Sequence, residues 1–223
     1  MRFQDAARDG RAVVYAGIQA DPLVARAASL LADATPAIRV MARAAMNGES
    51  TDPMVWMAMF PTLFGGDVAP DLRARAETVL AAALDVAERG EAVRSQVRGA
   101  IVEELTARLL ARRVPGEAIH RERRILFDGV RAEIHPYDVT VERDGAHEAY
   151  DCKWGARGIG DDVLHQLDDA RRHAADEDVS LRVGLVVYDA DRSCAVRLER
   201  STAPTAGVEV ISLETLDELA THR

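Results

Sequence analysis

Three residues in the second half of the chain carry the side chains best suited to chemistry. Asp138 stands in His-Pro-Tyr-Asp-Val-Thr-Val, and Asp151 and Lys153 stand in Ala-Tyr-Asp-Cys-Lys-Trp. Side chains alternate between the two faces of a strand, so Asp151 and Lys153 point the same way while Cys152 points oppositely. If the two segments pair as an antiparallel hairpin across residues 143–145, Asp138 lies near Asp151. The sequence therefore predicts two carboxylates and one ammonium group at one place.

Such a group of side chains suits the hydrolysis of phosphodiesters. Two close carboxylates either share a proton or bind a divalent cation, and oxygen ligands fit Mg²⁺ or Mn²⁺ better than zinc. The cation polarises a phosphoryl oxygen and lowers the pKa of a bound water, while a lysine orients that water or stabilises negative charge. We expect Asp138 and Asp151 to hold the metal and Lys153 to position the water.

The basic residues make Lys153 stand out. The chain has 28 lysine and arginine residues, and Lys153 is the only lysine, so the other 27 are arginine. Arginine differs from lysine in geometry and does not readily lose its proton. A position that keeps lysine against this bias is a strong indication of a specific role.

The chain changes character near residue 94. Proline and glycine punctuation predicts helices in the first part, and alternating or continuous apolar runs predict strands in the second. The expected helices are 23–33, 36–46 and 70–89 in the first part, and 95–113, 161–175 and 213–221 in the second. The expected strands are 123–127, 135–142, 147–154, 181–188 and 208–211. This order predicts an α-helical region over residues 1–93, then an α/β domain over residues 94–223 with a mixed β-sheet flanked by helices.

The ordered set of motifs resembles the PD-(D/E)XK nuclease superfamily, which has the restriction-endonuclease-like fold. The Mrr-like, RecB-like and Holliday-junction-resolvase-like branches are the most similar. Asp151-Cys152-Lys153 matches the D-x-K half of the motif, and Asp138 resembles its first acid, although Tyr137 precedes it and proline stands one position earlier. The resemblance covers about residues 94–222 and leaves the N-terminal helices out.

The resemblance implies further site residues. On the first helix of the family, a glycine is followed four residues later by a glutamate. In this chain the same spacing leads from Gly99 to Glu103, which is thereby implied as a third acid and metal ligand. A Gln-Leu pair on the helix after the lysine strand selects Gln166. The backbone carbonyl of Cys152 is implied as a further metal ligand, while the Cys152 side chain is expected to be a small core group.

Charge limits how the chain would meet nucleic acid. The formal net charge is −9 and the pI is about 5.2, whereas a protein that binds nucleic acid unaided usually has a basic surface. A local arginine patch is one way around this limit, with an ordinary solvated face as the alternative reading. The candidate phosphate-binding residues are Arg112, Arg113, Arg121, Arg123, Arg124 and Arg157.

These features together predict a Mg²⁺-dependent deoxyribonuclease. A role in antiviral defence or DNA repair follows by analogy only. Two alternatives stay open: a nuclease-fold subunit of a larger complex without catalysis, and a nuclease directed at RNA or at a particular DNA structure. We expect the N-terminal helices to dimerise the protein or to dock it to a partner. The two cysteines are too few for a disulfide framework, and the N-terminus has no signal-peptide pattern, so we expect a cytoplasmic protein. The longest apolar run is too short to cross a membrane, so we expect no membrane attachment.

Overall fold

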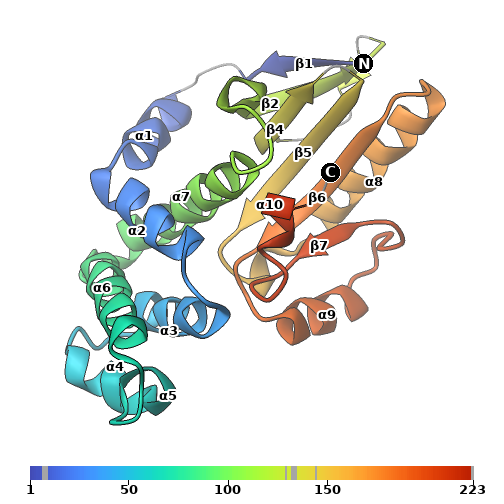
Figure 1. Cartoon of the computed structure of the whole chain (residues 1–223). Helices are drawn as coiled ribbons and strands as arrows, with labels where there is room; N and C mark the ends of the chain where they lie inside the picture. Colours follow the sequence, from blue (N-terminus) through green and yellow to red (C-terminus); the bar gives the residue numbers. More distant parts are fainter. Residues whose placement is uncertain (7–9, 129, 132–134, 144, 222–223) are drawn as a thin grey trace. The chain divides into compact units, whose positions relative to one another are not determined.

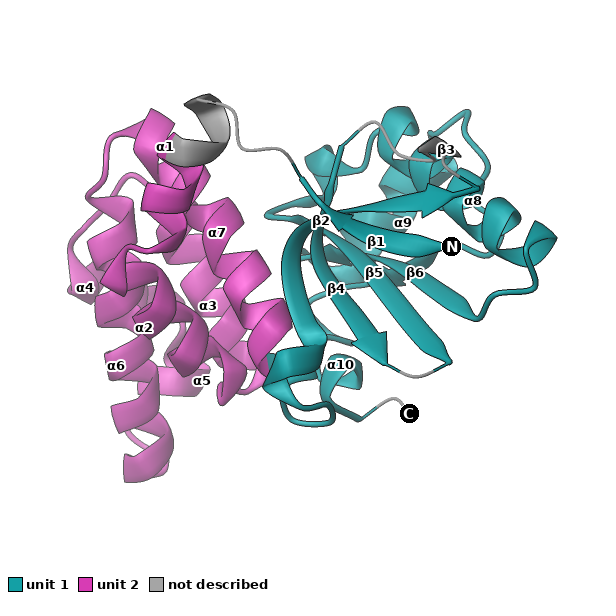
Figure 2. Ribbon diagram, turned by 90° about the horizontal axis from the view of Figure 1, so that it is seen from above, with its two compact units in different colours: residues 1–9, 109–223 teal, residues 10–108 magenta. Residues whose placement is uncertain are grey.

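The computed structural model describes residues 1–6, 10–128, 130–131, 135–143 and 145–221. Its contacts divide the chain into two compact units (Figure 2). Residues 10–108 form one, called here the helical unit, and residues 1–9 with 109–223 form the other, called the sheet unit. The boundary expected at residue 94 therefore falls inside a helix, α7 (Glu91–Leu110), most of which belongs to the helical unit.

The helical unit follows from its start and stop signals. Several of its helices begin with a proline that follows a capping residue, and the side chains of Asp21, Thr35 and Asp52 each accept a hydrogen bond from a backbone N–H of the first turn. Its α-helices besides α7 are α1 (Gly10–Gln19), α2 (Pro22–Ala32), α3 (Pro36–Asn47), α4 (Pro53–Met59), α5 (Pro61–Phe64) and α6 (Pro70–Ala87). The helices expected at 23–33, 36–46 and 70–89 are confirmed within two residues at each end.

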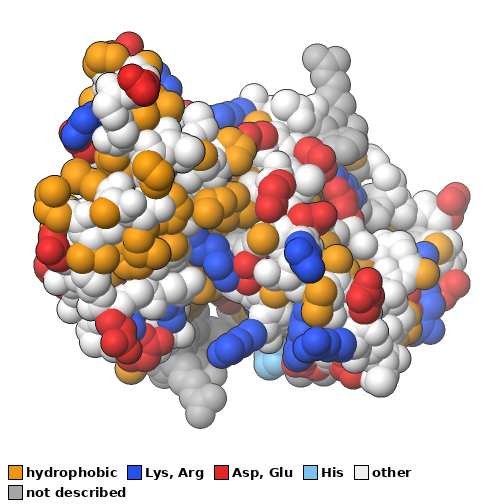
Figure 3. Space-filling model, turned by 90° about the horizontal axis from the view of Figure 1, so that it is seen from below, with side chains coloured by type: hydrophobic (Ala, Val, Ile, Leu, Met, Phe, Trp, Pro, Cys, Tyr) orange, Lys and Arg blue, Asp and Glu red, His pale blue; other side chains and the backbone are white. Residues whose placement is uncertain are grey.

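Helix α6 packs against α2 and α3 to form the core of the helical unit. Arg39 is almost fully buried there, at 1% exposure, and donates to the carbonyl oxygens of Leu31 and Ala32 at 3.0 and 3.2 Å. It thereby adds side-chain donors to carbonyl groups at the end of α2, where the helical pattern of hydrogen bonds stops. Helix α4 instead exposes Met54 and Met59, and apolar side chains gather over this unit on the face that Figure 3 presents.

The sheet unit is an α/β fold with a mixed sheet, as expected. Its strands follow the order β1-β2-β4-β5-β6-β7 (Figure 1), and β3 pairs with β2 off this path. The strands are β1 (Arg2–Asp5), β2 (Ile119–Phe127), β3 (Val130–Arg131), β4 (Tyr137–Arg143), β5 (Ala146–Lys153), β6 (Leu181–Val187) and β7 (Glu209–Ile211). The helices are η1 (Gly116–Ala118), η2 (Ala156–Gly158), α8 (Asp161–Asp176), α9 (Asp191–Glu199) and α10 (Glu218–Thr221).

The hairpin of β4 and β5 is the element that places the predicted site. The two strands pair antiparallel from Arg143 opposite Ala146 to Val139 opposite Tyr150. Gly145 adopts a φ of 73°, which an L side chain rarely takes and which a tight hairpin turn needs. Asp144, the middle residue of the expected turn, lies outside the described residues.

Strand β6 pairs parallel to β5 after the crossover through α8, and β7 pairs parallel to β6. Leu164 and Leu167 of α8 pack in one core cluster with Ala149 of β5 and Val183 and Leu185 of β6. Asp151 and Lys153 follow Ala149 at every second position, so they continue the row of side chains on the face that α8 covers. Figure 1 shows α8 lying along β6.

The structure adds elements that the sequence did not predict. Strand β1 pairs with the second half of β2, and α9 stands between β6 and β7 in the order of the chain. Strand β2 begins at Ile119 rather than at residue 123, and Glu122 within it has a φ of 52°, so the strand is kinked just before the predicted start. The last helix is shorter than the expected 213–221 and starts at Glu218.

Candidate active site

Asp138, Asp151 and Lys153 lie close together at the end of the hairpin. The register of β4 and β5, continued one step past Val139 and Tyr150, sets Asp138 opposite Asp151. There the carboxylate oxygen Oδ2 of Asp138 accepts the backbone N–H of Cys152 at 2.6 Å. The side chain of Asp138 thus occupies a backbone donor of β5 just beyond the last paired residues, and this bond fixes the carboxylate beside β5.

Lys153 forms an ion pair with Asp151, in which Nζ donates to Oδ1. Burial alone would lower the pKa of Lys153, but the carboxylates of Asp151 and Asp138 outweigh that effect and raise the pKa above its usual value. The side chain is therefore protonated at neutral pH. Lys153 is suited to donate hydrogen bonds and to stabilise negative charge, and it is not suited to act as a base.

The stem of Lys153 is confined by the turn that follows β5. A Cβ added to Gly158 in η2 would lie 3.0 Å from the Cβ, Cγ and Cδ atoms of Lys153, so only glycine leaves the lysine undisturbed. The backbone N–H of Tyr188, just after β6, donates to the carbonyl of Lys153 at 2.8 Å. Backbone and side chain of this lysine are both held.

Gln166 of α8 is buried and touches the chain just before β4. Its amide accepts from the backbone N–H of His135 at 3.2 Å and donates to the His135 carbonyl at 3.1 Å. These two hydrogen bonds to the backbone of His135 hold the segment that leads into β4, the strand that carries Asp138. Gln166 therefore has a contact that positions the site, and its predicted catalytic role stays a prediction.

Glu103 belongs to the helical unit, and its predicted meeting with Asp138 and Asp151 stays a prediction. Within that unit it is buried, at 4% exposure, and its two carboxylate oxygens accept from the Tyr15 hydroxyl and, at 2.7 Å, from the Gln19 amide. A Cβ at Gly99 would lie 3.3 Å from the Tyr15 hydroxyl oxygen, so the predicted glycine sits beside the same contact. Sequence reasoning passed over Tyr15 and Gln19 because nothing in α1 marks them as partners of Glu103.

The six candidate arginines for phosphate binding differ in their exposure and in their ion pairs. The side chain of Arg113 is 7% exposed and donates to both oxygens of Glu148, at 2.8 and 2.5 Å. Arg123 pairs with Asp5 and Glu142. Arg112 is exposed, and Arg121 and Arg124 are half-buried on β2. Arg157 is exposed in η2, next to the glycine that confines Lys153. Of the six, Arg157 lies closest in the chain to Asp151 and Lys153.

Two carboxylates can hold a hard cation here with water as the remaining ligands. Magnesium is commonly held by one or two carboxylates and keeps several waters, so the pair Asp138 and Asp151 fits it. Within the described ranges, no cluster of three or more His, Cys, Asp or Glu side chains has the geometry of a metal site. Cys152, whose carbonyl the resemblance implies as a ligand, has a buried side chain, as expected.

Comparison with known proteins identifies no relative of this chain. No protein-family model matches it, no curated protein matches it, and no solved structure matches its fold. Among the helices that the structure describes, none is long and apolar enough to cross a membrane.

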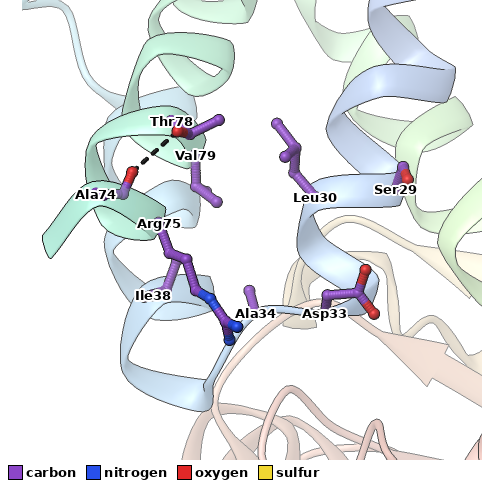
Figure 4. A pocket seen from close by; sticks show the side chains of 9 residues that line it. All are labelled: Ser29, Leu30, Asp33, Ala34, Ile38, Ala74, Arg75, Thr78 and Val79. Atoms are coloured by element: carbon purple, nitrogen blue, oxygen red, sulfur yellow. Dashed lines mark hydrogen bonds between the residues drawn. The ribbon is translucent and has the colours of Figure 1, made fainter. Parts of the chain in front are cut away.

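A hollow of about 610 Å³ lies elsewhere, in the helical unit, among α2, α3 and α6 (Figure 4). Leu30, Ile38 and Val79 give it apolar walls, and Asp33 and Arg75 stand at its sides. None of the predicted site residues lines it. The hollow and the carboxylate–lysine site are therefore separate features of the molecule.

Proposed function

We propose that this chain is a metal-dependent nuclease that hydrolyses DNA phosphodiester bonds and that its sheet unit has the restriction-endonuclease-like fold. The observation that carries the proposal is the contact of Lys153 with Asp151 beside Asp138, at the end of one hairpin. An antiparallel hairpin followed through a helix by a parallel strand supports the fold assignment.

Asp138 and Asp151 would hold Mg²⁺ or Mn²⁺, and Glu103 would join them directly or through water. The bound cation would polarise a phosphoryl oxygen and lower the pKa of a water. Lys153 would donate hydrogen bonds to that water or to the phosphate oxygens, because Asp151 keeps its ammonium group in place. Asp138 would be kept in position by the N–H of Cys152, and Arg157 would contact a backbone phosphate.

A Lys153→Ala variant tests this proposal on supercoiled plasmid, single-stranded DNA and RNA, each with Mg²⁺ or Mn²⁺. We expect the wild-type chain to cleave DNA and the variant to lose at least about 100-fold in rate, the typical loss when one group that stabilises developing charge is removed. Asp176→Asn, at the far end of α8 and exposed, is the matched control and is expected to cleave like the wild type.

Each outcome separates the readings that the sequence left open. Cleavage of RNA but not of DNA would replace the DNA-directed reading. Wild-type and Lys153→Ala chains that behave alike on every substrate would overturn the catalytic reading and leave a nuclease-fold interaction subunit.

A further inference from the structure

Asp189 is a buried carboxylate two residues after the end of β6, and it lies near the site without belonging to it. It is 7% exposed. Its Oδ2 accepts the backbone N–H of Ala156 at 3.0 Å and its Oδ1 that of Ala190 at 2.8 Å, while its own carbonyl accepts the N–H of Leu213 at 3.0 Å. Burying a carboxylate is costly unless hydrogen bonds replace its water, so these donors explain how the charge is accommodated.

The bond to Ala156 fixes the turn that follows Lys153. Ala156 is itself buried and opens η2, in which Gly158 donates to the Gly155 carbonyl at 2.8 Å and Ile159 to the Ala156 carbonyl at 3.1 Å. These bonds make residues 155–159 one compact turn. Anchoring the N–H of Ala156 therefore anchors the whole turn to the end of β6.

The same turn limits the room available to Lys153. Gly158 approaches the lysine stem so closely that a Cβ there would stand 3.0 Å from three of its carbons. Tyr188, the neighbour of Asp189, donates to the Lys153 carbonyl, and its ring stacks on Trp154 with centroids 5.1 Å apart. A continuous series of contacts thus runs from Asp189 through Ala156 and Gly158 to the lysine.

We propose that Asp189 is a positioning residue for Lys153: it holds the turn of residues 155–159 against the lysine stem and so keeps the ammonium group on Asp151. It touches neither the substrate nor the reacting atoms. The inference rests on the proposed function only where it says what the positioned lysine does.

Both oxygens of Asp189 accept from backbone N–H groups, and this requirement makes the proposal testable by a small change. Asparagine has the same shape but only one accepting oxygen. Asp189→Asn therefore leaves either Ala156 or Ala190 without its acceptor. Asp191→Asn is the matched control, because Asp191 is exposed and the substitution makes the same chemical change two residues away.

The single lysine provides a probe that does not depend on activity. Labelling the chain with ¹³C-lysine gives signals from Lys153 alone, because no other lysine is present. We expect Asp189→Asn to shift and broaden the ¹³Cε–¹Hε signal of Lys153 and to speed hydrogen exchange at the Ala156 amide by about tenfold or more. Gly158→Ala places a Cβ 3.0 Å from the stem carbons of Lys153 and is therefore expected to shift the same signal. Asp191→Asn leaves both observables at their wild-type values.

Cleavage kinetics give the second measurement. A displaced catalytic group costs about 100-fold in rate for about 1 Å of misplacement, so Asp189→Asn is expected to lower kcat by up to that factor while KM changes less than about twofold. A role in stability alone would lower the unfolding temperature and leave both kcat and the Lys153 signal of the folded protein unchanged.

The outcomes separate this proposal from the proposed function. A folded Asp189→Asn chain with an unmoved Lys153 signal overturns the positioning role, whatever the activity. A moved signal in a chain that cleaves no nucleic acid supports the positioning role and rejects the nuclease. If Asp189→Asn does not fold, Gly158→Ala carries the test, and an unmoved lysine signal in that variant overturns the proposal.

Discussion

The ammonium group of Lys153 owes its position to its neighbours on three sides. Asp151 binds it, Asp138 adds a second negative charge, and Gly158 lies along its stem. A side chain held in this way has little freedom to move, and so it is pre-organised for one task.

Lys153→Arg tests whether the compact ammonium group is needed or only a positive charge. Arginine keeps the charge but carries a planar guanidinium group that is wider than an ammonium group. Because arginine has the same stem carbons up to Cδ, the wider guanidinium group cannot take the place of the ammonium group on Asp151 by shifting the confined stem, and we expect a loss in cleavage rate of about 100-fold. The rate is measured on plasmid DNA with Mg²⁺, with the exposed Arg192→Lys as the reciprocal control. An arginine variant with wild-type activity would show that charge alone is enough.

An ion-pair network holds the strands β5, β6 and β7 together on the face opposite the site. Glu148 of β5 binds Arg113, accepts from the Tyr150 hydroxyl at 2.5 Å and lies 3.8 Å from Arg182, which in turn binds Glu209 of β7. Arg113 also donates to the Leu219 carbonyl of α10 at 2.7 Å. The network therefore links the end of the chain to the strand that carries Asp151.

Glu148→Gln is expected to destabilise the protein, and the loss should depend on pH. Burial by itself would raise the pKa of Glu148, but hydrogen bonds from Arg113 and Tyr150 outweigh burial and lower it below the usual 4.5. A carboxyl group with a lowered pKa in the folded state adds stability above its unfolded pKa and loses it as pH falls through the folded value. Removing one partner of a buried ion pair costs about 3 kcal/mol, so we expect that loss at pH 7 and a smaller one below about pH 4.5.

Urea unfolding of wild type and Glu148→Gln at pH 7, 5, 4 and 3 measures the free energy of unfolding for this prediction. Exposed Glu199→Gln is the control and should cost little at any pH. A cost for Glu148→Gln that stays constant from pH 7 to pH 3 would mean that the charge of Glu148 does not contribute.

The elements that the sequence predicted well are those with a strong local signal. The hairpin was predicted because two strand-like segments, residues 135–142 and 147–154, stand on either side of the turn sequence Arg143-Asp144-Gly145. Strand β1 was missed because its four residues have no such signal, and its partner β2 lies more than 100 residues away in the chain. Helix α9 was missed because it is mostly polar, with Cys194 as its only buried residue.

The candidate site divides in the same way. Asp151 and Lys153 are related by strand periodicity, and Asp138 by the hairpin, so local rules brought them together. Asp189 was not singled out, although an acid directly after a continuous apolar strand was a usable signal at the end of β6. Tyr15 and Gln19 act on Glu103 across more than 80 residues, and such contacts depend on tertiary packing that no local pattern contains.

The overall charge of the chain limits how it would bind the proposed nucleic-acid substrate. The net charge is −9, and acidic and basic side chains are interspersed on the face of the sheet unit in Figure 3. Affinity for a phosphate backbone must then come from a few local arginines, a bound cation or a partner. Arg113 and Arg123 are already occupied by carboxylates, so their charges are largely neutralised within the protein.

Arg157→Ala tests the local source of that affinity. Arg157 is exposed on the turn beside Lys153, and a phosphate contact there would release one counterion. We expect the variant to bind duplex DNA more weakly without change in sequence preference, and the slope of log K against log salt to fall in magnitude by about 1. Fluorescence anisotropy between 25 and about 200 mM salt, with Ca²⁺ in place of Mg²⁺ to prevent cleavage, gives both quantities over the range in which such contacts weaken. Arg192→Ala removes an exposed arginine from α9 and matches the change in net charge. Equal slopes for the two variants would mean that Arg157 acts only through net charge, and affinity would then have to come from a partner or from the cation.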